Sequence, residues 1–319
     1  MDAALAKPTV GFLGPIASYS HQAVLSVFSE DDWELRPLAT ITDVFDQVQD
    51  GRVPVGVVPF ENSSNGCVVV TLDNLADRDG RYKDILVQGE IYVNVNHCLI
   101  GKKTQGTGPA PAEAPLQAPN AFQHIKRLYS HPQAFGQCRK FIAANLKGAE
   151  VHEVNSTSRA AEMVSQGDAD MAAIASELAA ARFDGLEILA RRIQDRDDNV
   201  TRFLIIRNKS KSCTDAPIVS HTIASYARKA QGTKSLVSFT VPHTSPGALA
   251  DVLGCFKEQK LNLTSINSRP SLQHPFQYVF FVEFDGHKAD QDGRVESVLQ
   301  KMGRVAESSR WLGSWESHR

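Results

Sequence analysis

The chain lacks a long apolar run, a cysteine framework and a strong net charge. No run of about 18 apolar residues occurs in its 319 residues, so we expect no transmembrane helix and no membrane partner. The residues before Thr9 lack the charged and apolar regions of a secretory signal. The formal net charge of −2 offers no basic face for a nucleic acid.

Cysteine usage also excludes two classes of protein. The five cysteines are widely spaced, and no Cys-x-x-Cys pair or His/Cys cluster accompanies them. This pattern favours neither a disulfide framework nor a zinc site, and a reducing, cytoplasmic compartment is the simplest expectation. With 42% hydrophobic and 22% charged residues, the chain has an ordinary globular composition, and its length suits two or three compact units.

Short apolar strands alternate with amphipathic helices through most of the chain. Before residue 101 we expect strands at 9–13, 53–60 and 85–100, with helices at 19–30, 42–49 and 68–75. After a Gly-, Pro- and Ala-rich insertion at 101–120, we expect strands at 128–130, 150–154, 171–175 and 201–207. Helices are expected at 133–145 and 158–166, with a short one from Ser176. This alternation predicts an α/β fold built from parallel βαβ units.

The order of elements changes after a polar linker at residues 211–233. The remaining residues, 234–319, predict strands at 235–241, 262–268, 277–284 and 305–312, with helices at 246–259 and 291–302. The resulting order, βαββαβ, is the ferredoxin-like pattern.

Polar residues gather where predicted strands give way to helices, at residues 14–20, 59–66, 130–134 and 156–158, and again in Asn199-Val200-Thr201-Arg202-Phe203. Helix N-termini present unpaired N–H groups and bind anions at the carboxyl ends of strands. Any one of Ser18, Ser63 or Ser156 is more simply a helix cap, and His131 is either a general base or a turn residue. Together the junctions favour a cleft for a small organic anion, because none has the glycine spacing of a nucleotide loop.

These junctions resemble the motifs of the prephenate dehydratase family, in order and over nearly the whole chain. The family's Glu-Asn-Ser-x-x-Gly-x-Val is matched at residues 61–68, its Ser-His-Pro-Gln at 130–133, and its Thr-Arg-Phe at 201–203. The resemblance implies decarboxylating dehydration of prephenate to phenylpyruvate in phenylalanine biosynthesis, a carbon–oxygen lyase activity without a metal or other cofactor. It also implies a catalytic domain of periplasmic-binding-protein type at residues 1–210, with its site in the cleft between two lobes. One lobe takes residues 1–101 and 185–210, and the other takes 102–184.

The resemblance also implies roles for individual residues. Thr201 is the proton donor to the leaving hydroxyl, and Arg202 is the cation that meets the substrate dianion. A threonine hydroxyl is a weak acid, so Glu61 stays open as the donor, or alternatively as a structural clamp on its turn. The residues expected to bind substrate are Asn62, Ser63, Ser130, Gln133, Ser156, Thr157, Asn199 and Phe203. Taken alone, Phe203 is more simply a residue of the hydrophobic core.

The C-terminal segment, residues 234–319, resembles an ACT regulatory domain. Pro246, Gly247, Ala248 and Leu249 match the Pro-Gly-Ala-Leu turn, and Asn267, Ser268, Arg269 and Pro270 stand where the family has Glu-Ser-Arg-Pro. The resemblance implies phenylalanine as an inhibitory effector and a homodimer or homotetramer. Asn267 replaces a carboxylate, which predicts weaker binding of the effector's ammonium group. The domain could instead serve only for pairing.

Two other functions stay open at this point. Arogenate dehydratase performs the same chemistry on the aminated substrate. A catalytically silent amino-acid sensor is the second alternative, and the intact Thr201-Arg202-Phe203 argues against it. No helical extension resembling chorismate mutase precedes Thr9, so we do not expect that activity.

Overall fold

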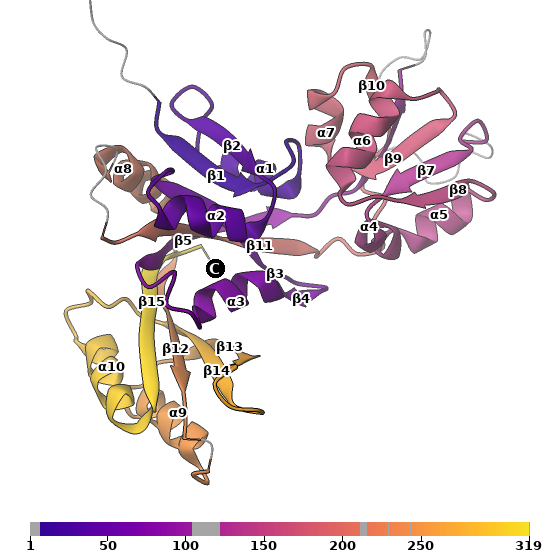
Figure 1. Cartoon of the computed structure of the whole chain (residues 1–319). Coiled ribbons are helices and arrows are strands. Elements are labelled where there is room, and N and C mark those ends of the chain that lie inside the picture. Colours follow the sequence, from indigo (N-terminus) through magenta and orange to yellow (C-terminus); the bar gives the residue numbers. More distant parts are fainter. Residues whose placement is uncertain (1–6, 104–121, 211–215, 229, 243, 319) are drawn as a thin grey trace, which may run out of the picture. The chain divides into compact units, whose positions relative to one another are not determined.

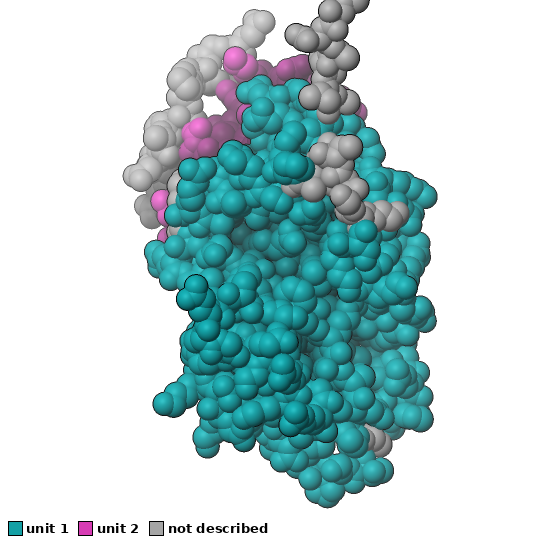
Figure 2. All heavy atoms as spheres, turned by 90° about the vertical axis from the view of Figure 1, so that its left-hand side faces the viewer, with its two compact units in different colours: residues 1–13, 23–92, 202–319 teal, residues 14–22, 93–201 magenta. Residues whose placement is uncertain are grey.

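The computed structural model describes residues 7–103, 122–210, 216–228, 230–242 and 244–318. The chain forms two compact units (Figures 1 and 2). Unit 1 takes residues 1–13, 23–92 and 202–319, and unit 2 takes residues 14–22 and 93–201. The predicted insertion at 101–120 lies outside the described residues from position 104 onward.

Unit 1 is built on a ten-stranded sheet with the order β13-β14-β12-β15-β5-β11-β3-β1-β2, and β4 pairs with β3. Strand β1 runs parallel to both of its neighbours, β2 and β3, as the βαβ prediction requires. The amino-terminal elements and those that lead to the C-terminal segment are β1 (Thr9–Leu13), β2 (Glu34–Leu38), α2 (Ile41–Gln49), β3 (Val55–Asn62), β4 (Gly66–Cys67), α3 (Val69–Ala76), β5 (Ile85–Asn94), β11 (Val200–Asn208) and α8 (Ala216–Ala227).

The C-terminal segment of unit 1 has the predicted βαββαβ order. Its elements are β12 (Gly232–Thr240), α9 (Ala248–Glu258), β13 (Leu263–Pro270), β14 (Tyr278–Asp285), α10 (Arg294–Val305) and β15 (Ser308–Ser317). Strand β12 lies between β14 and β15 and is antiparallel to both.

Apolar cores lie on both faces of this C-terminal sheet at β12, β14 and β15, whereas much of β13 is exposed. Val237 and Phe239 of β12 face a core shared with α9 and α10. Leu236 faces the opposite way, into a core shared with α2, α3 and β3. Because side chains alternate along a strand, one strand supplies both cores. The C-terminal segment is therefore packed into unit 1 through an apolar core.

Unit 2 has a five-stranded sheet with the order β10-β6-β9-β7-β8. Apolar cores lie on both faces of this sheet. Its elements are β6 (Cys98–Lys102), β7 (Arg127–Ser130), α4 (Pro132–Gln137), α5 (Arg139–Asn145), β8 (Glu150–Glu153), α6 (Thr157–Gln166), β9 (Met171–Ala175), α7 (Glu177–Arg182) and β10 (Leu186–Ala190), and α1 (Tyr19–Leu25) is divided between the two units.

The fold class is confirmed, but several predicted elements were wrong in extent. The strand expected at 85–100 is two strands: β5 joins the first sheet and β6 the second. Both parts of this run are rich in apolar residues, so composition did not show that the pairing partner changes. The helix expected at 133–145 divides at Cys138, the helix from Tyr19 ends at Leu25, and β2 and β10 were missed. The predicted linker contains helix α8. No helix in the described ranges is long and apolar enough to cross a membrane.

Gly313 allows the C-terminal segment to join the sheet of unit 1. It pairs with Val87 of β5, at a backbone φ of 142°. A Cβ atom built on Gly313 would lie 2.1 Å from the carbonyl oxygen of Val87, and this φ is one that residues other than glycine rarely adopt.

We therefore expect Gly313→Ala to lower the free energy of unfolding by about 2–4 kcal/mol, because strain and a backbone clash add together. Urea denaturation would measure the change. Gly254→Ala in α9 is the matched control, because a Cβ there meets nothing within 4 Å and alanine favours the helix. Equal midpoints for Gly313→Ala and the parent would contradict the steric argument.

Candidate active site

Strand β11 carries Thr201, Arg202 and Phe203 in its first half. Thr201 is partly exposed, whereas Arg202 and Phe203 are buried. Successive side chains of a strand point to opposite faces, so Thr201 and Arg202 face different surroundings. Phe203 is 1% exposed, which favours the reading of it as core.

Arg202 belongs to a buried cluster of four charged side chains. Its Nη2 atom lies 2.8 Å from Oε2 of Glu90 on β5 and also donates to Glu283 on β14. Lys234 of β12 lies 3.3 Å from Glu283 and 3.5 Å from Glu90. The four side chains are between 0% and 8% exposed. Two positive and two negative charges balance, and removing one partner from such a group typically costs about 3–5 kcal/mol.

We call Glu90, Arg202, Lys234 and Glu283 the charge cluster. Its two carboxylates also accept hydrogen bonds from neutral donors. Thr264 donates to Glu283 at 2.8 Å. Ser317 and the backbone of His318 donate to Glu90 at 2.8 and 3.2 Å. Burial by itself raises the pKa of Glu90, but the charges of Arg202 and Lys234 and the Ser317 hydrogen bond outweigh it, and the pKa lies below its usual value.

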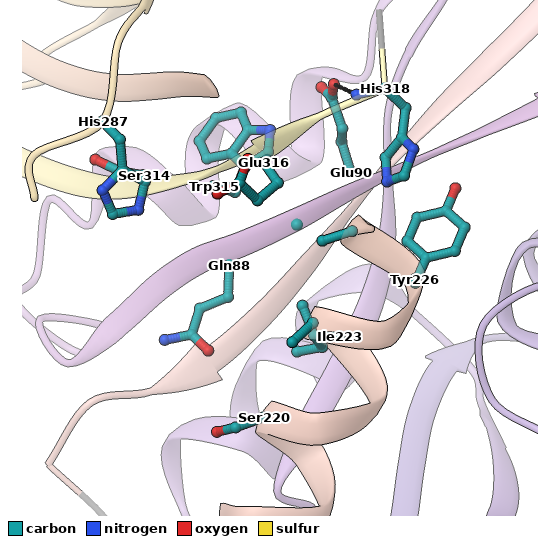
Figure 3. Close-up of a pocket in the computed structure, with 13 residues that line it drawn as sticks. Gln88, Glu90, Ser220, Ile223, Tyr226, His287, Ser314, Trp315, Glu316 and His318 are labelled. Atoms are coloured by element: carbon teal, nitrogen blue, oxygen red, sulfur yellow. Dashed lines mark hydrogen bonds between the residues drawn. The ribbon is translucent and has the colours of Figure 1, made fainter. Parts of the chain in front are cut away.

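A cavity of about 240 Å³ lies beside Glu90 (Figure 3). The close-up shows Tyr226 of α8 and His318 near the Glu90 side chain, with the backbone hydrogen bond from His318 drawn as a dashed line. The rings of Tyr226 and His318 are 4.2 Å apart, so helix α8 closes over this end of the charge cluster.

Arg202 also contacts strand β3, which carries Glu61. The guanidinium lies over the ring of Phe60 at 5.3 Å, and its Nη1 atom is 3.9 Å from Glu61. The Glu61 side chain is 38% exposed. The structure therefore joins two of the three predicted catalytic residues, Arg202 and Glu61, in one unit. Thr201, one residue earlier on β11, falls in unit 2.

The hairpin after Glu61 shows how the Glu-Asn-Ser motif folds. Asn62 accepts hydrogen bonds from the backbone N–H groups of Ser64 and Asn65, both at 3.0 Å. Gly66 then takes a φ of 80°. Ser63 is exposed at the tip of this turn. Helix α3 begins after Val68 without a side-chain cap, so its first turn presents N–H groups to an anion.

Several predicted site residues of unit 2 have structural partners. Ser130 is buried and donates to the carbonyl of Ile174 at 2.7 Å. His131 caps α4 and accepts from the backbone of Gln133, and burial lowers the pKa of His131. Ser156 caps α6. The cap readings of Ser156 and Ser18 are confirmed, and Ser18 accepts from His21 at 3.2 Å.

The remaining predicted residues of unit 2 lie at helix starts or near the change of unit. Gln133 is exposed in the first turn of α4, and Thr157 is the first residue of α6. Asn199 is buried, and its carbonyl accepts from Val95 at 2.8 Å. This bond joins the two chain segments that lead into β6 and β11.

A polar network centred on His97 was not predicted from the sequence. The buried His97 ring lies 3.1 Å from the Tyr19 hydroxyl and 2.8 Å from Gln137. Gln194 accepts from the His97 backbone at 2.9 Å. Burial lowers the pKa of His97 and raises that of Tyr19. This network fixes residues 96–97, where the chain leaves β5 for β6.

The predicted effector residues fall into two groups. Gly247, Ala248 and Leu249 line a cavity of about 500 Å³ at the start of α9, opposite Tyr278 and Phe280 of β14. Gly247 has a φ of 83° and provides no side-chain cap. Residues 267–270 lie on β13 and are not among those that line this cavity.

Arg269 of this second group has a partner elsewhere in unit 1. It forms a two-pronged ion pair with Asp73 of α3, at 2.8 and 3.0 Å. Arg78 contacts the same carboxylate at 2.7 Å and donates to the carbonyl of Pro270. Asn267 donates to Ser265 at 3.1 Å. The strand that carries these predicted effector residues is thus tied to the helix that follows the Glu61 hairpin.

Comparison with known proteins identifies the family. The family model for prephenate dehydratase matches residues 10–211, which include Glu61, the Ser130–Gln133 segment and Thr201–Phe203. The chain belongs to the prephenate dehydratase family. A bifunctional chorismate mutase/prephenate dehydratase from Aquifex aeolicus is 35% identical over 97% of this chain and 74% of its own length. The predicted family and lyase class are confirmed.

Solved structures agree with this assignment and add a contrast. A prephenate dehydratase from Arthrobacter aurescens, solved in complex with L-Phe, is 28% identical, with a TM-score of 0.77 over 97% of this chain and 90% of that one. A protein described as GqqA, a novel type of quorum-quenching acylase, is 25% identical, with a TM-score of 0.72 over 97% and 98% of the two chains.

The Asp73–Arg269 pair predicts acid sensitivity of the prephenate dehydratase fold. Burial raises the pKa of Asp73, but hydrogen bonds from Arg269 and Arg78 outweigh it and lower the pKa overall. A carboxyl group whose pKa is lowered on folding stabilises the protein at pH values above the pKa that it has in the unfolded chain. This stabilisation is lost as the pH falls through the pKa that the group has in the folded protein. We expect the urea midpoint to fall as the pH is lowered below about 4, the ordinary pKa of an aspartate, and Asp73→Asn to show a shallower fall.

The control for this measurement is Glu258→Gln, which removes an exposed carboxylate paired with Lys301. Exposed pairs contribute little, so this variant should follow the parent at every pH. The same slope in Asp73→Asn as in the parent would show that Asp73 does not carry the acid response.

Proposed function

We propose that this chain converts prephenate to phenylpyruvate. The observation that carries the proposal is the match of the prephenate dehydratase model to residues 10–211, with Thr201 and Arg202 present in β11 and Glu61 beside Arg202. In the reaction the ring carboxylate leaves as carbon dioxide, and its bonding electrons enter the ring. The ring hydroxyl leaves with one proton as water, and the ring becomes aromatic.

This chemistry asks little of the protein. Aromatisation supplies driving force, so the enzyme must hold a reactive conformer and assist the departure of the hydroxyl. We assign Thr201 to the leaving hydroxyl. The proton comes from Thr201 itself or from Glu61, whose partly exposed carboxyl lies on the strand next to β11.

The substrate's carboxylates require donors. Within unit 1, Ser63 and the uncapped first turn of α3 supply them, and within unit 2 Gln133 and Thr157 supply them from the starts of α4 and α6. These donors add no fixed charge. They suit a small dianion, since helix N-termini stabilise negative charge through oriented N–H groups. We assign Asn62, Ser130, Ser156, Asn199 and Phe203 to the support of these residues.

Phenylalanine is the proposed effector, and the cavity at the start of α9 is its proposed site. The relative from Arthrobacter aurescens was solved with L-Phe, and the cavity here combines apolar walls with the first-turn N–H groups of α9. Exposed apolar residues on and beside β13 and β14, namely Ile266, Leu272, Phe276 and Tyr278, support the proposed homodimer or homotetramer. The proposed place of action is the cytoplasm.

The assay for the function is ultraviolet detection of phenylpyruvate after prephenate is mixed with the protein, with arogenate as the parallel substrate. We expect Thr201→Ala to lower kcat at least about a hundredfold while the circular dichroism spectrum is retained, because the hydroxyl that contacts the leaving group is lost.

Glu61→Gln distinguishes the two proton donors. If Glu61 supplies the proton, the variant loses activity as fully as Thr201→Ala. If Thr201 supplies it, Glu61→Gln retains most of its kcat. Near-normal turnover by Thr201→Ala would remove Thr201 from the mechanism, and no product from either substrate would overturn the proposed function.

Inhibition by phenylalanine depends on the Gly247 turn. We expect Gly247→Val to raise the inhibition constant at least about tenfold, because a β-branched residue is strained at this φ and must reshape the first turn of α9. Calorimetric titration with phenylalanine would measure binding directly. Gly303→Ala in α10, where a Cβ has open space, is the control, and equal affinity in Gly247→Val would place the effector elsewhere.

A further inference from the structure

Glu283 belongs to the C-terminal βαββαβ segment, yet its carboxylate accepts from Arg202 of the Thr-Arg-Phe motif. We propose that Glu283 is a positioning residue for the dehydration reaction: it holds Arg202, and through Arg202 it places Thr201 and Glu61. This inference rests on the proposed function. It assigns the C-terminal segment a positioning part in catalysis, separate from effector binding.

The geometry of β11 transmits the effect of Glu283. Arg202 and Thr201 are consecutive, so the direction of the Arg202 side chain fixes the rotation of the strand and with it the direction of Thr201 on the opposite face. The other side of the guanidinium lies over Phe60 and 3.9 Å from Glu61. Arg202 therefore lies on the strand that carries Thr201, β11, and contacts the strand that carries Glu61, β3.

Arg202 is largely occupied by protein groups. Its Nη2 atom is shared by Glu90 and Glu283, and its side chain is 5% exposed. Its Nε atom has no hydrogen-bond partner among the described residues, but it is buried, so the guanidinium offers no solvent-facing donor there. An arginine in these surroundings is better placed to orient a strand than to bind a substrate carboxylate directly.

Glu283 is itself held firmly. Thr264 donates to its second oxygen at 2.8 Å, and Lys234 lies 3.3 Å away. The carboxylate lies near the end of β14, after the apolar run Val279-Phe280-Phe281-Val282, and it is 1% exposed, so an unpaired charge there would be costly. Ion pairs with Arg202 and Lys234 offset the cost of burying this charge. The positions of Glu283 and Arg202 therefore depend on each other.

The test uses the full chain with Glu283→Gln, which keeps the shape of the side chain and removes its charge. We expect kcat for prephenate to fall at least about tenfold while KM changes less than about threefold, because reactive groups are displaced and substrate ligands are not. Hydrogen–deuterium exchange should speed up in peptides that cover residues 199–204.

A second, milder variant guards against a folding defect. Thr264→Val removes only the hydroxyl that orients Glu283, and residue 264 is exposed. We expect a smaller fall in kcat than in Glu283→Gln, of about threefold to tenfold, because Glu283 keeps its charge and its contact with Arg202 and only loses one orienting hydrogen bond. Glu258→Gln, an exposed carboxylate of the same segment, is the control and should match the parent in kinetics and exchange.

The outcomes separate the inference from the proposed function. Unchanged kcat in both folded variants would overturn the inference, and so would a loss confined to KM, which would indicate that Arg202 binds substrate. A parent protein that forms no phenylpyruvate would overturn the function. The exchange of residues 199–204 would then decide the positioning claim alone: faster exchange in Glu283→Gln supports it, and equal exchange overturns it.

Discussion

The need to neutralise the buried charge of Arg202 constrains unit 1 more than any other polar interaction. A guanidinium with 5% of its side chain exposed is stable only where carboxylates meet it, and here Glu90 and Glu283 come from strands far apart in the sequence. Glu90 lies on β5, and Glu283 on β14 of the C-terminal segment. Arg202 of the Thr-Arg-Phe motif and Glu283 of the C-terminal βαββαβ segment thus belong to one charge cluster. Neither half of unit 1 satisfies this cluster alone.

The same dependence appears in the apolar packing and at the surface. One core contains residues of α2, α3 and β3 together with Leu236, Phe281 and Trp315 of the C-terminal segment. Arg269 reaches Asp73 of α3, and Arg310 reaches the carbonyls of Tyr82 and Ile85. A C-terminal segment bound in this way is not a loosely tethered module. A ligand that shifts it must also shift contacts with α3 and β11, which gives a physical basis for the proposed control by an effector.

Polar residues at the predicted junctions proved to have two uses. Ser18, His131 and Ser156 cap helices, and Ser130 joins β7 to β9. Ser63 and Gln133, in contrast, are exposed beside helix starts. The same residue types serve both purposes because a hydroxyl or amide that satisfies a helix N-terminus is chemically the same as one that binds a ligand. Composition at a junction therefore identifies a region, and only the hydrogen bonds separate structural members from candidate ligands.

The sequence by itself determined the α/β class, the βαββαβ order and the family, because these depend on local periodicity and on short motifs. It located Thr201, Arg202 and Glu61 as residues of interest. It did not show that the β-branched run at 85–100 changes sheets near His97, because a strand's composition does not name its partner. Nor did it single out Glu90, Lys234 and Glu283, although a charge within an apolar strand is a visible signal. Which charges meet is decided by strand order and register, so only the tertiary structure could place Arg202 between two buried carboxylates.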